Sequence, residues 1–160
     1  MELEQCFNKV WRLKVVHLND GHKYGIPYWR FDSAKEAKAI NKQAALEWCK
    51  KEIWEKMRLS ELPEPLRLPL FDWAFAENST FEPIYYGLIL PYKSATEQRP
   101  LRFSGFEGQT ELTDDVVKFA TNLTPESVAQ ARILCYKNYR DPSAREKCQT
   151  VENRIKSLQK

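Results

Sequence analysis

The chain has 160 residues, of which 42% are hydrophobic and 12% aromatic, and this is enough apolar material for one globular domain with its own core. Its 25 Lys and Arg residues against 22 Asp and Glu residues give a net charge of +3, with the two signs interleaved, so no basic block indicates a nucleic-acid partner. No apolar run approaches the roughly 20 residues of a membrane-spanning helix, and we expect no membrane span.

The first half of the chain carries the spacing of amphipathic helices. Apolar residues fall on one side of a helix from Leu3 to Leu13, and Asn19-Asp20-Gly21 then predicts a turn before a short extended or irregular segment at 24–31. The same spacing predicts a second helix from Leu46 to Met57. Prolines bracket the entry to a third helix from Leu66 to Glu77, where they cost little.

The second half is also expected to be helical around one long loop. An apolar helix beginning at Phe81 is predicted to end at Pro91, and residues 91–111 are expected to form the loop because they lack periodicity. Further helices are predicted at 112–122, from Thr124 to about Arg140, and from Asp141 to Leu158. The pattern predicts an all-α protein that folds as one compact unit.

The cysteines do not indicate a metal site. Cys6, Cys49, Cys135 and Cys148 contain no Cys-x-x-Cys pair, and the chain has only two histidines, so neither a metal nor a cofactor is expected. Cys135 and Cys148 flank a turn and would either form a disulfide across a helical hairpin or remain buried thiols; the second alternative is favoured.

Five short motifs occur along the chain, and each is weak evidence alone, but their order can be compared with that of a known family. They are Lys14-Val15-Val16-His17-Leu18-Asn19-Asp20 with Tyr24-Gly25-Ile26-Pro27, then Ile53-Trp54, Leu70-Phe71-Asp72 with Ala74, Gly105 with Gly108 and Thr110, and Asn153-Arg154. In this order they resemble the motifs of glycoside hydrolase family 108, the phage and bacterial N-acetylmuramidases. The resemblance implies a lysozyme-like helical fold, with 1–90 as the muramidase-like region and 91–160 resembling a peptidoglycan-binding half.

The chain differs from this family around the position of the catalytic residue. Lys14 stands at the position of the catalytic glutamate, Val15 and Val16 replace two glycines, and the following loop is shortened. Glycosidic cleavage needs a carboxylic acid that is still protonated near neutral pH, which lysine cannot supply. Asp20 is the displaced candidate for this role, although its turn sequence favours a loop residue. Asp72, inside an apolar helix, is expected to be a satisfied structural carboxylate.

Aromatic and polar residues beside the altered motif form a candidate ligand-binding set. Tyr24, Tyr28 and Trp29 could stack on sugar rings, while Arg30 or His22 could hydrogen-bond to sugar hydroxyl or acetamido groups. Core packing is the alternative for the three aromatic residues, and the sequence leaves both open.

Three functions follow from these observations. The leading hypothesis is a muramidase-like pseudoenzyme that binds a protein partner, as a phage- or prophage-derived structural, inhibitory or anti-defence factor. The alternatives are an active peptidoglycan hydrolase that uses Asp20 and a non-catalytic peptidoglycan-binding module. The N-terminal residues lack the basic start and apolar segment of a secretory signal, so the protein is expected to be cytoplasmic as synthesised, with export by a holin or secretion system, or to be phage-borne.

Overall fold

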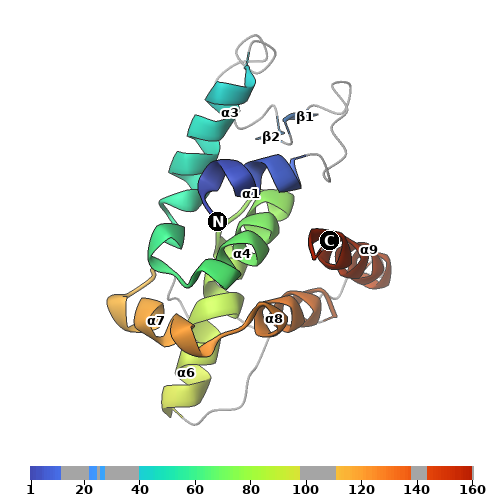
Figure 1. Ribbon diagram of the computed structural model, residues 1–160. Coiled ribbons are helices and arrows are strands. Elements are labelled where there is room, and N and C mark those ends of the chain that lie inside the picture. Colours follow the sequence, from blue (N-terminus) through green and yellow to red (C-terminus); the bar gives the residue numbers. More distant parts are fainter. Residues whose placement is uncertain (12–21, 25, 28–39, 98–110, 138–143, 160) are drawn as a thin grey trace.

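The computed structural model describes residues 1–11, 22–24, 26–27, 40–97, 111–137 and 144–159 (Figure 1). Helices form nearly all of the regular structure in these ranges, which confirms the all-α fold class. The strands in the same ranges are β1 (His22–Lys23) and β2 (Ile26–Pro27), which pair antiparallel; β2 lies within the segment 24–31 predicted to be extended or irregular, and β1 lies just before it. None of the described helices has the length and apolar character that crossing a membrane requires.

The helices occur close to the predicted positions. In chain order they are α1 (Leu3–Val10), α3 (Lys42–Cys49) with its π-helical continuation η3 (Lys50–Trp54), the 3-10 turn η4 (Leu59–Glu61), α4 (Glu64–Glu77), α5 (Phe81–Ile84) with the π-helical η5 (Tyr85–Ile89) and α6 (Leu90–Glu97), α7 (Asp114–Phe119) with the 3-10 turn η6 (Ala120–Asn122), α8 (Pro125–Lys137) and α9 (Ala144–Leu158). The predicted helix spacing therefore locates the helical segments, except for the turn η4 and the helix α6.

Helix α4 is the central element of the fold and contacts α1, α5 and α8 (Figure 1). Five consecutive residues from Phe71 to Phe75 are buried, so the helix is covered on all sides rather than on one face. A helix in this position needs apolar side chains around its whole circumference, and the buried stretch from Leu70 to Phe75 has them except at Asp72. The helix ends where Asn78 takes a left-handed conformation and Ser79 N–H donates to the Ala74 carbonyl.

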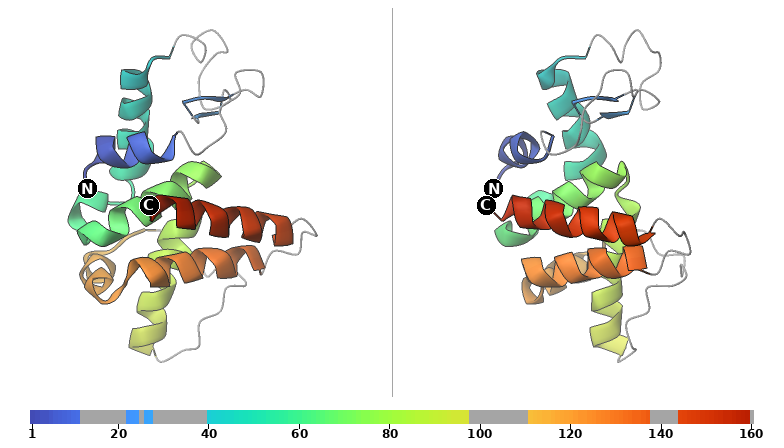
Figure 2. Two further views of the ribbon diagram at one scale, coloured as in Figure 1. Left: turned by 45° about the vertical axis from the view of Figure 1, so that its right-hand side comes forward. Right: turned by 90° about the vertical axis from the view of Figure 1, so that its right-hand side faces the viewer.

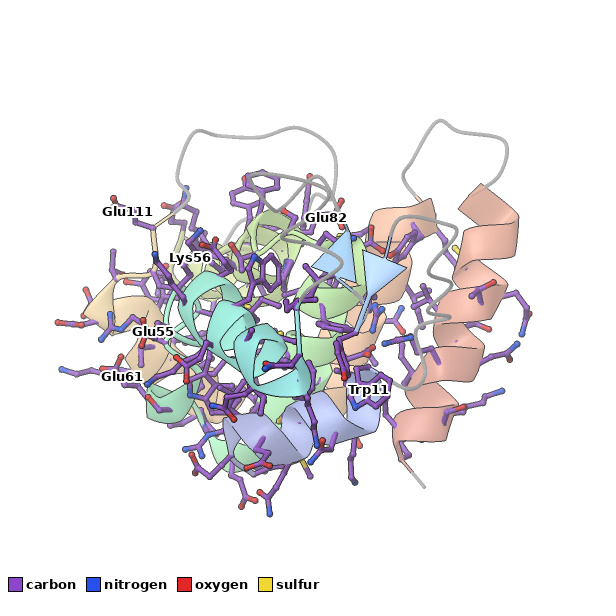
Figure 3. The ribbon with its side chains drawn as sticks, turned by 90° about the horizontal axis from the view of Figure 1, so that it is seen from above. Trp11, Glu55, Lys56, Glu61, Glu82 and Glu111 are labelled. Atoms are coloured by element: carbon purple, nitrogen blue, oxygen red, sulfur yellow. The ribbon has the colours of Figure 1, made fainter. Side chains whose placement is uncertain are left out.

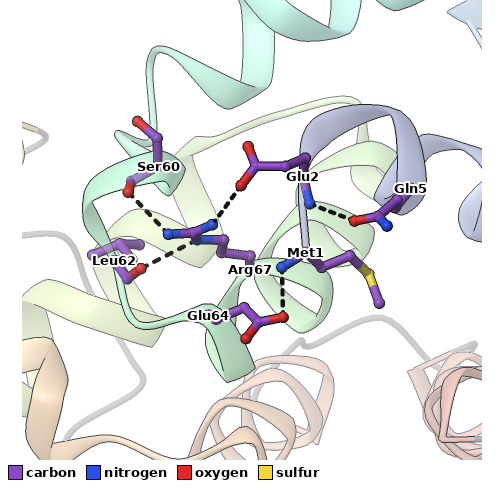
Figure 4. Close-up of polar contacts among 7 residues, drawn as sticks. All are labelled: Met1, Glu2, Gln5, Ser60, Leu62, Glu64 and Arg67. Carbon is purple, nitrogen blue, oxygen red and sulfur yellow. Dashed lines mark hydrogen bonds and ion pairs between the residues drawn. The ribbon is translucent and has the colours of Figure 1, made fainter.

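Polar contacts fix the start of the chain against the entry to α4 (Figure 4). The Glu2 backbone N–H donates to the Gln5 side chain as part of a capping box at the start of α1. Arg67 donates to the Glu2 carboxylate at 3.1 Å and also to the backbone carbonyls of Ser60 and Leu62. A single arginine thereby connects α1, η4 and α4.

The prediction that a helix ends at Pro91 and that a loop occupies 91–111 is wrong at its start. The helix continues through Pro91 to Glu97, while 98–110 lie outside the described residues. The π-helical segment Tyr85–Ile89 ends two residues before this proline, and its hydrogen bonds span one residue more than those of an α-helix. In a regular α-helix the ring of Pro91 would clash with the carbonyl of the residue four positions earlier. The wider π-helical turn lies at that place, and the helix continues past the proline.

Helices α8 and α9 lie side by side, and α8 packs against α4 and η5 (Figure 2). A small cluster of Tyr136, Cys148 and Val151, with Ile155 packed against it, joins the two helices. Cys135 and Cys148 are unbridged, buried thiols, as favoured from the sequence. The contact between α8 and α9 therefore depends on side-chain packing rather than on a covalent link.

Candidate functional site

Most of the predicted site residues fall outside the part of the chain that the structure describes. These are Lys14, Asp20, Tyr28, Trp29 and Arg30, and for His22 the structure describes the backbone alone, in strand β1. Whether these residues come together therefore stays a prediction.

Tyr24 is described and lies at the edge of the core. Its ring packs edge-on against Trp11, with 5.3 Å between the ring centroids, and its backbone has a φ of 51°, in the left-handed region. Figure 3 shows Trp11 at the end of α1 that is close to the two strands. Tyr24 therefore packs the strand pair against α1. Because its side chain is partly buried, only the exposed part could stack on a sugar ring.

The polar centre of the described structure is a buried cluster of three charged residues, Asp72, Arg132 and Arg154. Asp72 on α4 is fully buried; it accepts a hydrogen bond from Nη1 of Arg132 on α8 at 2.7 Å and bonds from Nε of Arg154 on α9 at 2.7 and 2.9 Å. Arg154 also donates to the backbone carbonyl of Val10 in α1 at 3.3 Å. Three helices, α4, α8 and α9, therefore meet at one carboxylate, and Arg154 connects a fourth, α1, to this cluster.

This cluster accounts for Asp72 as a structural residue. A carboxylate buried away from water is costly unless it is paired and hydrogen-bonded, and here two guanidinium groups supply both conditions. A general acid must be protonated and must reach the substrate, whereas this carboxylate accepts several bonds and is not exposed. The expectation that Asp72 is a satisfied structural carboxylate is confirmed.

Arg132 is the member of the cluster that is incompletely paired. Its side chain is 2% exposed, and only Nη1 reaches Asp72, while the buried Nε and Nη2 atoms have no hydrogen-bond partner among the described residues. One carboxylate and two guanidinium groups also leave the cluster with a net charge of +1. Buried N–H groups without partners are rare in proteins, because a donor that has lost its hydrogen bonds to water and gained none in the protein is costly.

An apolar pocket of about 250 Å³ adjoins this arginine. It lies between α4, α8 and α9 and is lined by Met1, Glu64, Pro65, Leu68, Pro69, Pro125, Val128, Ala129, Arg132, Ile155, Leu158 and Gln159. Its size is above the cavity of about 150 Å³ that holds a benzene molecule in a protein core.

The helical spacing of the lining residues places the charged cluster at one end of the pocket. On α4 the lining residues Pro65, Leu68 and Pro69 are followed on the same face by Asp72. On α8 the lining residues Val128 and Ala129 are followed on the same face by Arg132, which itself lines the pocket. The pocket is therefore apolar along its length and cationic at this end.

Glu64 lies at the opposite end of the pocket, in the first turn of α4, and its charge is compensated. Its carboxylate accepts a hydrogen bond at 2.7 Å from the amino group of Met1 (Figure 4). That hydrogen bond holds the pKa of Glu64 below its ordinary value, so the carboxylate is ionised at neutral pH. The Glu64 pair contributes no net charge, and the surplus positive charge of the lining comes from Arg132.

A smaller and more polar hollow lies on another side of the molecule. It has a volume of about 150 Å³ and is lined by Trp48, Glu52, Ile53, Lys56, Asn78, Ser79 and Thr80. The acidic residue in this lining, Glu52, forms a salt bridge with Lys56, with 2.6 Å between Oε2 of Glu52 and Nζ of Lys56. The carboxylate of Glu52 therefore already has a partner inside the hollow. Lys56 is labelled in Figure 3.

The cysteines are not activated for nucleophilic chemistry. Burial raises the pKa of the Cys6 thiol to about 11 and also raises the pKa of Cys135. A catalytic cysteine needs the opposite shift because the thiolate is the nucleophile. Among the described residues, no group of three or more His, Cys, Asp or Glu side chains could hold a metal ion.

Sequence reasoning identified Asp72 and Arg154 within motifs but missed Arg132. The available signal was its position on α8: Val128 precedes it by one helical turn on the same face, so Arg132 continues an apolar stripe. A charged residue on such a stripe indicates a buried partner, although the sequence does not say which one.

Comparison of the chain with protein-family models, with curated proteins and with solved structures finds no match. The resemblance to glycoside hydrolase family 108 therefore stays a prediction from the motifs.

Proposed function

We propose that the protein is a muramidase-like pseudoenzyme that acts by binding a protein partner. The observation that carries this proposal is Lys14 at the position where the resembling family has its catalytic glutamate. The loss of two glycines at Val15 and Val16 supports it, because these glycines would let a substrate approach the backbone.

The buried cluster gives further support, because it removes Asp72 from the candidates for a replacement acid. Asp72 belongs to a segment that resembles the family, and it is both enclosed and bonded to two arginines. A protein that keeps such a scaffold without its acid retains a shaped surface, which is what binding requires.

The test is release of soluble muropeptides from purified peptidoglycan, with an active muramidase as positive control. We expect no release by the parent protein or by Lys14→Glu, because restoring the acid does not restore the two glycines and the loop. Release by the parent protein that is abolished in Asp20→Asn would overturn the proposal and identify a displaced acid.

The fraction of protein that sediments with the cell wall is measured in the same tubes. We expect the protein to stay in the supernatant. Sedimentation that is lost in Trp29→Ala would instead identify a peptidoglycan-binding module and would contradict a protein partner as the ligand of this surface.

A further inference from the structure

We propose that the pocket between α4, α8 and α9 binds an uncharged hydrocarbon of about ten carbon atoms, such as an alkyl-substituted aromatic ring. Such a ligand would be bound whether or not the protein also binds a protein partner.

The charged groups of the lining are already engaged within the protein. Nη1 of Arg132 is bonded to Asp72, and its Nε and Nη2 atoms are inaccessible, so the positive charge of the cluster lies behind the accessible wall of the pocket. The Glu64 carboxylate and the Met1 amino group are 2.7 Å apart and are bonded to each other. A charged ligand would lose its hydration without gaining a partner in this lining, which is costly, whereas an uncharged ligand avoids that cost.

Large apolar side chains around the pocket are incompletely covered by the fold. Leu68 on α4 and Ile155 and Leu158 on α9 are only partly buried, and all three line the pocket. Removal of apolar surface from water is favourable in proportion to the area removed. A hydrocarbon in the pocket would complete the burial of these three side chains and would itself leave water.

The pocket also has stiff walls and a defined size. Three of its lining residues are prolines, Pro65 and Pro69 on α4 and Pro125 at the start of α8, and proline rings restrict the backbone. Little ordering is therefore required on binding, which favours affinity. A cavity of about 150 Å³ holds the six carbons of benzene, so the volume of about 250 Å³ is in proportion space for about ten carbon atoms.

The test is a titration of the full chain, labelled with carbon-13 at its methyl groups, with n-butylbenzene, followed by NMR. We expect saturable shifts of the methyl signals of Leu68, Val128 and Ile155, and nuclear Overhauser effects from the ligand to these methyl groups. The methyl signals of Val116, which is buried in α7 and is not part of the lining, should not move. Benzene is expected to bind at least about tenfold more weakly, because it buries less apolar surface.

Two variants of α8 separate the pocket from the rest of the surface. Ala129→Phe places a ring in the pocket and should abolish the binding of n-butylbenzene, whereas Gln130→Phe adds the same ring at an exposed position and should leave binding unchanged. Circular dichroism checks that both variants are folded. The nuclear Overhauser effects in the parent protein decide the question even if Ala129→Phe does not fold.

Three results would each overturn the proposal. They are the lack of saturable shifts of the three methyl signals in the folded parent protein, nuclear Overhauser effects to methyl groups outside the lining in place of these, and undiminished binding in folded Ala129→Phe.

Discussion

A buried carboxylate that holds two arginines is an unusual element of a helical core, and Asp72 has this position. Charged residues are rarely buried without partners, because water solvates them far better than a protein interior does. The three charges here are mutually dependent: Asp72 is stable in the core because of Arg132 and Arg154, and both arginines would be left with uncompensated charge in its absence. Removal of one member therefore affects all three.

Asp72→Asn is expected to lower the free energy of unfolding by about 3–5 kcal/mol, because it leaves the charges of Arg132 and Arg154 uncompensated in or next to the core. Urea unfolding followed by circular dichroism measures this loss. Asp115→Asn is the matched control, at an exposed position in the first turn of α7, and should cost less than about 1 kcal/mol. Equal costs for the two variants would mean that the buried ion pairs do not contribute to stability.

At the scale of single elements, the helical run from Phe81 to Glu97 shows how a sequence can accommodate both proline and close packing. Its π-helical segment includes Gly87, which packs against Trp73 of α4. A Cβ atom at Gly87 would lie 3.2 Å from the Trp73 ring and 3.4 Å from a Leu70 methyl group. Both neighbours are fully buried and have little room to move, so the glycine permits the two segments to approach.

Gly87→Val is expected to destabilise the protein by about 1–3 kcal/mol, because it overpacks the contact between η5 and α4. The measurement is the thermal or urea unfolding of the variant. Gln130→Val introduces the same side chain at an exposed helical position and should cost less than about 1 kcal/mol, the helix-propensity difference alone. A neutral or stabilising effect of Gly87→Val would show that Trp73 can shift and that the approach is not tight.

At the scale of the whole molecule, the last helix is joined to the first by a single side chain. Arg154 on α9 bonds to Asp72 on α4 and to the Val10 carbonyl at the end of α1. Leu158 of α9 also packs against the main core. The described C-terminal helices thus contact the N-terminal half through the packing of α8 on α4 and through Arg154 and Leu158 of α9, which itself packs on α8 (Figure 2).

A chain that ends at residue 143, without α9, is expected to unfold at a lower urea concentration than the Asp72→Asn variant. It loses Arg154 and also the apolar contacts of α9 with α8 and the core. Lys156→Ala, at an exposed position of α9, is the control and should leave the midpoint unchanged. A truncated chain that unfolds at the same midpoint as this control would contradict the integration of α9 into the fold.

The sequence by itself determined the helical class and the approximate positions of the helices, because amphipathic spacing and proline placement are local properties. It also predicted that Asp72 is structural, since a single acid in an apolar helix needs a partner. It failed at Pro91 because the π-helical turn before that proline is a feature of the packed backbone and has no clear local signal. That Lys14 occupies the position of a catalytic acid stays a prediction from the sequence, because it rests on the resemblance alone.

Only the tertiary structure decided which residues Asp72 meets. Arg132 and Arg154 are 60 and 82 residues away from Asp72 along the chain, and no local pattern relates positions at such distances. Their meeting depends on how α4, α8 and α9 pack, and the same packing creates the apolar pocket beside Arg132. The physical reason is that a buried charge and a pocket are both defined by what surrounds them, and those surroundings exist only after the helices have come together.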